Sequence, residues 1–311
     1  MPFTTHAMAF DRFGAADVLA PREVELPDPG PGQVRIAVRT AGVNPLDCKI
    51  RSGAMQELFP LPLPHVPGLE AAGVVESVGP EVDELAVGDE VFGWTTTGSY
   101  AGHALAEAGR VARRPYRLGW AEAAAVPTAA ETALRCFRLL DLKPGETLLV
   151  HAAAGGVGTL ALQFAAARGI RVIGTASERN HAYVRELGAV PVAYGEGLAE
   201  RVRAVAPQGV DAALDGAGRG GAIEASIELT GGTERVVNMT HPAEAARHGV
   251  LFADGDASSD AAGALAEASS LHVADGLRLP VHRLYPLAEA AEAMRESEAG
   301  HVRGKLVLVV R

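Results

Sequence analysis

The feature that constrains this chain most is a glycine-rich stretch, residues 151–158, which reads His-Ala-Ala-Ala-Gly-Gly-Val-Gly. Residues 147–150 before it form a short apolar run that predicts a buried strand. Residues 160–168 after it are good helix formers, and residues 170–175 predict a second strand. Strand, glycine turn, helix and strand in this order form one right-handed crossover unit of a parallel sheet.

The turn fits the pattern A-x-G-x-x-G at Ala153, Gly155 and Gly158. Missing side chains let the backbone approach a pyrophosphate, and the N–H groups and dipole at the start of the helix attract the anion. The turn therefore predicts a dinucleotide site. The plainer alternative is a glycine-rich loop without a ligand, because Ala153 replaces the usual first glycine. The predicted contacts are Ala154, Gly155, Gly156, Val157 and Gly158.

Composition limits the class of protein. A chain of 311 residues with 48% hydrophobic content favours two domains with large cores. The net charge is −10 and no basic run exceeds two residues, so we expect neither nucleic acid nor a membrane as a partner. The two cysteines, Cys48 and Cys136, give no disulfide framework. Together with the lack of a signal-peptide pattern, this indicates a reducing, cytoplasmic location.

The pattern of the chain changes along its length. Up to about residue 118 the signals are strand-like, with the first patterned stretch at Met8, and frequent glycine and proline turns suggest a small irregular barrel. Residues 119–140 are helical in pattern, and an alternation of strands and helices then continues to about residue 269. Pro286 is expected to open a final helix, and residues 305–310 predict a closing strand.

Five segments together resemble the medium-chain dehydrogenase/reductase superfamily, in particular its zinc-free quinone oxidoreductase branch, over nearly the whole chain. These segments are residues 41–47, 66–75, 87–93, 153–158 and 303–308. The resemblance implies an α/β protein with a GroES-like, barrel-type catalytic domain built from residues 1–124 and 270–311. A doubly wound Rossmann domain that binds NADPH, residues 125–269, is inserted between them, with the active site in the cleft. Most relatives are dimers, so a homodimer is expected.

The resemblance also bears on metal binding. Zinc-dependent relatives have a cysteine at the position of Asn44 and a histidine at the position of Leu69. Zinc at a catalytic site needs about three nitrogen, sulfur or carboxylate ligands from the protein. Glu70 and Cys48 remain nearby, but they are too few, and we expect Glu70 to be a paired structural carboxylate. The sequence therefore predicts no metal site.

The choice of nucleotide depends on the residues after the second strand. An NAD site carries Asp or Glu there to bind the ribose 2′-hydroxyl. Here the strand end is small and neutral, and Ser177 and Arg179 follow as donors suited to a 2′-phosphate. The sequence therefore predicts NADPH. The alternative is that Glu178 binds the ribose of NAD and Arg179 is solvated. Tyr194 matches a tyrosine that lies on this side of the nucleotide in relatives, although packing also explains it.

Relatives place the loop that matches Asn44 and Asp47 beside the nicotinamide. The Asn44 amide suits orientation of a carboxamide or a substrate carbonyl, while a turn residue before Pro45 is the alternative. Lys49 replaces a tyrosine found in part of the family and is suited to stabilise a developing enolate or hydroquinone oxygen. Its alternative is a surface lysine. We take Asn44, Asp47 and Lys49 as the candidate catalytic residues.

Further positions follow from the resemblance. Thr128 matches a threonine or small residue near the cofactor, and Gly216 and Gly218 match a turn that flanks the nicotinamide ribose. Four larger side chains lie in segments that relatives use to shape the acceptor pocket, although core packing explains each one as well. They are Phe59, Trp94, Met239 and Phe252.

The expected function is a zinc-independent, NADPH-dependent oxidoreductase that transfers hydride to a quinone or an α,β-unsaturated carbonyl. Both acceptors take hydride at an electron-poor carbon and gain charge on an oxygen, which hydrogen-bond donors can stabilise without a metal. A simple alcohol dehydrogenase is disfavoured because its substrate usually needs zinc. Two alternatives stay open: an enoyl-thioester reductase, and a non-catalytic NADPH-binding structural or sensor protein.

Overall fold

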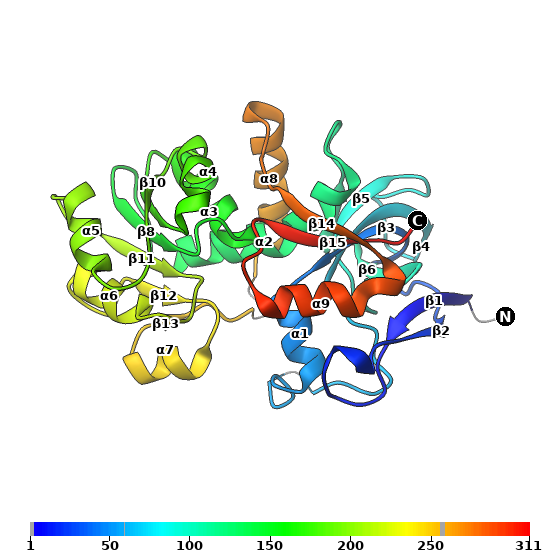
Figure 1. The fold of residues 1–311 in the computed structure, drawn as a ribbon. Coiled ribbons are helices and arrows are strands. Elements are labelled where there is room, and N and C mark those ends of the chain that lie inside the picture. The colour runs from blue at the N-terminus through cyan, green and yellow to red at the C-terminus, as the bar shows by residue number, and fades with distance from the viewer. Residues whose placement is uncertain (1–2, 59, 256–258) are drawn as a thin grey trace. The chain divides into compact units, whose positions relative to one another are not determined.

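A computed structural model describes residues 3–58, 60–255 and 259–311 (Figure 1). The chain divides into two compact units. Unit 1 contains Met1–Thr128 and Ala261–Arg311, and unit 2 contains Ala129–Asp260. The division lies four residues after the boundary expected at residue 124 and nine residues before the one expected at residue 269, so residues 261–269 belong to unit 1 and not to the nucleotide-binding unit.

Unit 1 is built on strands from both ends of the chain, which pair antiparallel except for the parallel pair of β14 and β15. Strands β1 and β2 form a two-stranded sheet, and a larger sheet has the order β14-β15-β3-β4-β5-β7, with β6 also paired to β3. The closing strand β15 lies between β14 and β3 (Figure 1). The strands are β1 (Phe3–Ala9), β2 (Ala20–Leu26), β3 (Gln33–Val43), β4 (Glu70–Val78), β5 (Glu90–Trp94), β6 (His103–Glu107), β7 (Val111–Arg113), β14 (Val281–Pro286) and β15 (Lys305–Val309).

The helices of unit 1 cover parts of these sheets. Helices α1 and α9 contact each other, and α8 contacts β7. The α-helices are α1 (Pro45–Ser52), α8 (Ala261–Asp275) and α9 (Ala290–Ala299). The short 3₁₀ helices are η1 (Ala16–Val18), η2 (Ala108–Arg110) and η4 (Leu287–Glu289). Helix α2 (Trp120–Leu139) contains the division between the two units.

Three expectations for unit 1 need correction. The first strand begins at Phe3 rather than near Met8, because residues 3–9 pair along their length with β2. The strand-like region contains helix α1, which begins directly after Asn44. Pro286 ends strand β14, and the following helical residues are first a 3₁₀ turn and then α9.

Unit 2 contains a parallel sheet. Within its described residues, six parallel strands have the order β10-β9-β8-β11-β12-β13, which is the doubly wound order 3-2-1-4-5-6 of dinucleotide-binding folds. The predicted fold class is therefore confirmed. The strands are β8 (Thr147–His151), β9 (Arg171–Thr175), β10 (Val190–Val192), β11 (Ala212–Asp215), β12 (Val236–Asn238) and β13 (Leu251–Phe252). The helices are α3 (Gly156–Ala167), η3 (Glu178–Asn180), α4 (His181–Glu186), α5 (Leu198–Val205), α6 (Ala222–Thr230) and α7 (Pro242–His248).

Burial explains why this sheet forms. Every residue of β8 is buried, as expected for the central strand of a parallel sheet with helices on its faces. Leu149, Ile173 and Ala213 from three neighbouring strands join one hydrophobic cluster with Val202 of α5. Because the strands are parallel, their carboxyl ends lie along one edge of the sheet, where ligands of such folds bind.

Among the described residues, no helix is both long and apolar enough to cross a membrane.

Candidate functional site

The glycine turn of unit 2 begins where β8 ends. Ala152 has a left-handed backbone with φ of 57°, which turns the chain sharply after the strand. The Ala153 N–H donates to the carbonyl oxygen of Thr175 on β9 at 3.0 Å, and the Gly155 N–H donates to the carbonyl oxygen of Ala152 at 2.9 Å. Helix α3 starts at Gly156, with Gly155 as its N-cap. The turn is thus fixed against the two central strands by backbone hydrogen bonds.

The two glycines of the fingerprint are needed for different reasons. A Cβ on Gly158 would collide with the carbonyl oxygen of Ala152 and lie 2.7 Å from the Cα of Ala153, so close packing of helix on strand requires this glycine. A Cβ on Gly155 would meet only the Ala152 oxygen, at 3.3 Å. The protein's own packing leaves Gly155 largely open. Its missing side chain therefore leaves room for a ligand to approach the first N–H groups of α3.

The residues expected at the 2′-phosphate follow strand β9. Ser177 is the N-cap of η3 and its hydroxyl oxygen accepts a hydrogen bond from Asn180 Nδ2 at 3.2 Å, which leaves the hydroxyl hydrogen to donate. Arg179 and Glu178 are exposed on η3. Tyr194, after β10, is also exposed. Of these residues, the positively charged and hydroxyl groups suit a phosphate, and Glu178 suits a ribose hydroxyl.

Gly216 and Gly218 lie in the loop after β11, and packing within unit 2 accounts fully for Gly218 and in part for Gly216. A Cβ on Gly216 would collide with Cε of Met239. Gly218 has φ of 61°, and a Cβ there would collide with the Thr240 side chain. These two glycines let the loop after β11 pack directly against the loop after β12.

A buried histidine closes strand β8. The His151 ring lies 3.2 Å from Thr175 Oγ1 through Nδ1 and 2.9 Å from Ser226 Oγ through Nε2. Ser226 Oγ donates its only hydrogen to the carbonyl oxygen of Ala222, so it must accept from His151 Nε2–H. Nδ1 is then the acceptor for the Thr175 hydroxyl. Burial lowers the pKa of His151 to about 4, with the Asp215 charge acting in the opposite direction, so the ring is neutral at pH 7.

In unit 1, Asn44 and Asp47 form the start of helix α1. Asn44 is the N-cap, Pro45 follows at the first helical position, and the Asn44 N–H donates to Asp47 Oδ2 at 2.8 Å. This is the backbone half of a capping box. The turn interpretation of Asn44-Pro45 is therefore wrong, because the same residue types also begin helices.

Asn44, Glu70 and Lys305 make a buried polar network. Asn44 Nδ2 donates to Glu70 Oε1 at 2.8 Å, and Lys305 Nζ donates to the same oxygen at 2.7 Å and to Asn44 Oδ1. Glu70 Oε2 accepts from the backbone N–H of Thr128 at 2.7 Å. Glu70 is fully buried, and Asn44 and Lys305 are nearly so. The expectation that Glu70 is a paired structural carboxylate is confirmed by this ion pair.

Two orphaned oxygen atoms lie on the residues of this network or beside it. Asp47 Oδ1 and Thr128 Oγ1 are buried, and neither has a hydrogen-bond partner among the described residues. Asp47 Oδ2 accepts from Asn44 and from the hydroxyl of the buried Tyr100 at 3.2 Å. Burial raises the pKa of Asp47 to about 7, more strongly than these hydrogen bonds and Lys305 lower it. Burial therefore favours the protonated form of the Asp47 carboxyl.

The structure thus brings some predicted residues together. Asn44, Asp47 and Thr128 are connected through hydrogen bonds to Glu70 and through the cap of α1. Lys49 is half-buried on the same helix, and burial lowers its pKa. Sequence reasoning missed Lys305 and Tyr100. A lysine inside the apolar strand at residues 305–309 was the available signal for the first, because lysine is rarely buried without a partner.

The donor set around Asn44 does not fit zinc. Both atoms of the Asn44 amide and both oxygens of Glu70 are engaged by other groups, one of them the Lys305 ammonium. Leu69 has no ligand atom. Burial raises the pKa of the Cys48 thiol to about 12, so a thiolate ligand there is costly. The Lys305 ammonium is the cation that neutralises Glu70 in this network.

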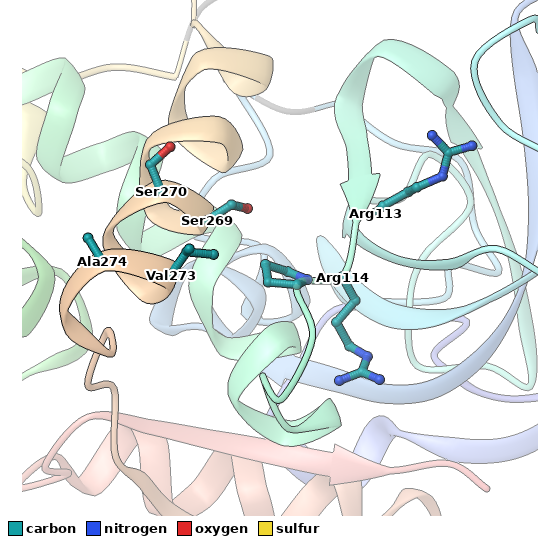
Figure 2. A pocket seen from close by; sticks show the side chains of 7 residues that line it. Arg113, Arg114, Ser269, Ser270, Val273 and Ala274 are labelled. Carbon is teal, nitrogen blue, oxygen red and sulfur yellow. The ribbon is translucent and has the colours of Figure 1, made fainter.

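The residues expected to shape an acceptor pocket are scattered. Trp94 ends strand β5 and is nearly buried, Met239 follows β12, and Phe252 ends β13. Phe59 lies outside the described residues. A surface hollow elsewhere in unit 1 lies between α8 and residues 113–115, with Ser269, Ser270, Val273 and Ala274 on the helix side (Figure 2). Its two arginines point away from α8 and pair with Asp89 and Glu90. None of the candidate site residues lines this hollow.

Two family models match the chain. Residues 30–134 match the alcohol dehydrogenase GroES-like domain, and residues 187–308 match the zinc-binding dehydrogenase family. A quinone oxidoreductase from Sus scrofa is 43% identical over 170 residues, which are 53% of this chain and 50% of that protein. Polyketide synthase GfsB from Streptomyces halstedii is 38% identical over 303 residues, which are 90% of this chain and 5% of the synthase. The matched stretch therefore spans about half, or far less, of these curated relatives.

Solved structures match over nearly their full length. The quinone oxidoreductase of Coxiella burnetii has a TM-score of 0.83 and 31% identity, covering 99% of this chain and 100% of that one. A mycobacterial protein solved with NADPH has a TM-score of 0.82 and 30% identity, covering 98% and 100%. An NAD-dependent alcohol dehydrogenase has a TM-score of 0.86 and 29% identity, also covering 98% and 100%. The chain belongs to the medium-chain dehydrogenase/reductase superfamily, in its quinone oxidoreductase branch.

Removal of the Lys305 charge should destabilise unit 1. Lys305→Met leaves Glu70 buried without its cation, and breaking such a pair costs about 3–5 kcal/mol. Both tryptophans, Trp94 and Trp120, lie in unit 1, so urea unfolding followed by tryptophan fluorescence reports on this unit. The double variant Lys305→Met with Glu70→Gln should recover at least half of the loss.

Arg113→Met is the matched control for this experiment, because it removes an exposed ion pair with Asp89 and should cost less than about 1 kcal/mol. A loss for Lys305→Met no larger than for this control would contradict the importance of the buried pair.

Asp47→Asn should become more favourable for unit 1 as the pH rises. The folded pKa is about 7 against an ordinary value of 3.8, so the stability contributed by the protonated carboxyl is complete below the lower value and is lost as the pH rises through the higher one. The variant-minus-wild-type difference in unfolding free energy should grow by about 4 kcal/mol between about pH 4 and pH 8. Asp17→Asn, at an exposed carboxylate of the same unit, is the matched control for the substitution itself. A flat or falling difference for Asp47→Asn would show that its pKa is not raised.

Proposed function

We propose that this protein is a zinc-independent, NADPH-dependent oxidoreductase that transfers hydride to a quinone or to a carbon–carbon double bond conjugated with a carbonyl. The observation that carries the proposal is the glycine turn at the carboxyl end of β8, with Gly155 open to a ligand, in a chain 31% identical to a quinone oxidoreductase structure over 99% of its length. The predicted homodimer and cytoplasmic location belong to the same proposal.

The dinucleotide would bind along the carboxyl edge of the sheet of unit 2. The N–H groups that begin α3 suit the pyrophosphate, and Ser177 and Arg179 suit a 2′-phosphate on the β9 side. The absence of an acidic residue at the end of β9 supports NADPH over NADH, since the first carboxylate after the strand is the exposed Glu178. A solved relative with bound NADPH is consistent with this choice. Because another solved relative is NAD-dependent, the affinities for NADPH and NADH must both be measured.

When bound, NADPH would supply the hydride, and the acceptor would take up a proton from water, on the oxygen of a quinone or on the α-carbon of an enone, to complete the reduction. Asn44 has one amide hydrogen beyond the bonds to Glu70 and Lys305, and this hydrogen is the donor that could orient a carbonyl oxygen. Lys49 is the candidate donor to a developing negative charge, because its partial burial strengthens such an interaction. Asp47 is the least accessible of the three, and its part is to hold Asn44 in place through the cap of α1.

A second candidate function is an enoyl-thioester reductase. It uses the same hydride step, and the similarity to most of this chain within a polyketide synthase, a class of enzyme that builds acyl chains, supports it. The remaining alternative, a non-catalytic NADPH-binding structural or sensor protein, accounts for the glycine turn but gives no use to the second amide hydrogen of Asn44.

Arg179→Ala should weaken NADPH binding by roughly ten- to a hundredfold, because a charge-assisted hydrogen bond contributes about 1.5–3 kcal/mol. NADH binding should change by less than about twofold in the same variant. Glu178→Ala is the informative companion, because under the NAD alternative this change, and not the first, should weaken NADH. Titrations followed by nucleotide fluorescence measure all of these affinities. Equal wild-type affinity for NADPH and NADH would remove the basis for the NADPH preference.

Turnover should separate the three candidate functions. The wild-type protein with NADPH is mixed with a quinone, an enone and an enoyl thioester, and NADPH absorbance is followed in the stopped flow. A quinone or enone reductase should show its highest kcat/KM on one of the first two acceptors and keep it after dialysis against a chelator. Preference for the thioester would favour the second candidate. Tight NADPH binding without turnover of any acceptor would favour the non-catalytic alternative, and activity lost with stoichiometric zinc would contradict zinc independence.

A further inference from the structure

Two neighbouring strands of unit 2 end in buried polar residues that the proposed function has not used. Strand β11 ends at Asp215 and strand β12 ends at Asn238, and the two residues are direct partners in the parallel register. Both are fully buried. Buried carboxylates and amides are costly unless their hydrogen-bonding capacity is met, so each bond at this pair needs an account.

The hydrogen bonds of the pair bind two loops to each other. Asp215 Oδ1 accepts from the N–H groups of Ala217 at 2.8 Å and Gly218 at 3.0 Å, in the loop after β11. Asn238 Oδ1 accepts from the N–H groups of Thr240 at 2.9 Å and His241 at 2.8 Å, in the loop after β12. The two side chains are joined by Asn238 Nδ2, which donates to Asp215 Oδ2 at 2.8 Å.

The direction of every bond follows from the chemistry of the groups. A carboxylate only accepts hydrogen bonds, so Asn238 must present its NH₂ group to Asp215 and its oxygen to the second loop. Four backbone N–H groups of the two loops are thereby satisfied by two side-chain oxygens. The same two loops also lie in close contact, with Gly216 next to Met239 and Gly218 next to Thr240.

The position of the pair in the sheet indicates which part of a ligand it serves. Strand β8, with the glycine turn at its end, lies between β9 on one side and β11 and β12 on the other. The 2′-phosphate end of NADPH is proposed to lie beside β9. A dinucleotide with its pyrophosphate at the glycine turn then extends its other half toward the loops after β11 and β12.

We propose that Asp215 and Asn238 are positioning residues that hold these two loops as one body in the conformation that binds the nicotinamide half of NADPH. This inference rests on the proposed function for the identity of the ligand. The pair lies under the loops and is buried, so it acts through the loop backbone and not by contact with the dinucleotide.

The pair offers a sharp test because its two residues can be exchanged. Asp215→Asn alone sets two NH₂ groups against each other, and Asn238→Asp alone sets two carboxylates against each other. In the double variant Asp215→Asn with Asn238→Asp, the amide at 215 donates to the carboxylate at 238, and both loop oxygens remain acceptors. Every hydrogen bond of the wild type is kept with one direction reversed, and the net charge is unchanged.

The measurements are the affinities for NADPH and for adenosine 2′,5′-bisphosphate, which lacks the nicotinamide half. Each single variant should bind NADPH at least tenfold more weakly and the bisphosphate within about twofold of wild type. The exchanged double variant should recover NADPH affinity to within about threefold. Hydrogen exchange of the ligand-free protein should be faster at residues 217–218 and 240–241 in the single variants and normal in the double variant.

Val202→Ala controls for loss of stability, because it opens a cavity in the core of unit 2 at a residue of helix α5 that belongs to neither loop. It should lower the unfolding temperature and leave both affinities unchanged. If the single variants fail to fold, the double variant must still fold and bind NADPH; failure of the double variant overturns the inference.

Three other results would also count against the positioning role. Single variants with wild-type NADPH affinity would overturn it while leaving the proposed function intact. Equal weakening of NADPH and the bisphosphate would show a general structural role instead. If the wild-type protein shows no measurable binding of either NADPH or the bisphosphate, the proposed function is overturned, and this inference with it.

Discussion

The buried ion pair between Lys305 and Glu70 is the interaction on which unit 1 most depends. It joins the last strand of the chain, β15, to the first residue of β4, which is 235 residues earlier in the sequence. A charge without a partner at either position would cost several kcal/mol, so the two ends of the chain must meet for the unit to be stable. Asn44 and the N–H of Thr128 fill the remaining positions around the carboxylate. Gly42 is required beside it, because a Cβ there would collide with Glu70 Oε1.

The same requirement shapes the carboxyl edge of the sheet in unit 2. Four adjacent strands end in a buried polar residue: Thr175, His151, Asp215 and Asn238 in spatial order. Each has its hydrogen bonds met by a neighbouring strand end, a helix or a loop backbone. An edge that binds a ligand needs loops of fixed shape, and directional bonds from buried side chains fix loops more specifically than apolar contacts can.

The local parts of this structure could be predicted from the sequence, and the distant parts could not. The strand, glycine turn and helix around residues 147–168 are visible in the chain as an apolar run, a glycine pattern and a run of helix formers, although β8 also pairs with the distant β11. Helix α1 was missed although Asn44, Pro45 and Asp47 occupy N-cap, first-turn proline and capping-box positions. The pattern of an Asn-Pro turn and of a helix start is the same over these residues, and only the packing of α1 on α9 decides between them.

The candidate site shows the same limit. Ser177 and Arg179 could be selected because they follow a recognisable strand, whereas nothing local indicates that Lys305 pairs with Glu70 or that Asp215 meets Asn238. Gly216 and Gly218 are both expected near the cofactor, yet a φ of 61° and the contact with Thr240 already favour glycine at 218, whereas a Cβ at 216 would mainly displace the end of the Met239 side chain. A glycine pattern therefore identifies a close approach without saying whether the approaching group is a ligand or another loop.

Burial also shifts the pKa of one titratable group in each unit, in opposite directions. In unit 1 it raises the pKa of Asp47 to about 7, so the contribution of this carboxyl to stability falls as the pH rises from about 4 to 7. In unit 2 it lowers the pKa of His151 from 6.5 to about 4, so the contribution of the neutral ring is complete above about pH 6.5 and falls as the pH decreases toward 4. The cause is the same desolvation, and the sign differs because the charged form is the deprotonated one for Asp47 and the protonated one for His151. Between about pH 4 and pH 6.5, a fall in pH therefore removes stability at the strand end that carries the glycine turn and adds stability at the cap that holds Asn44.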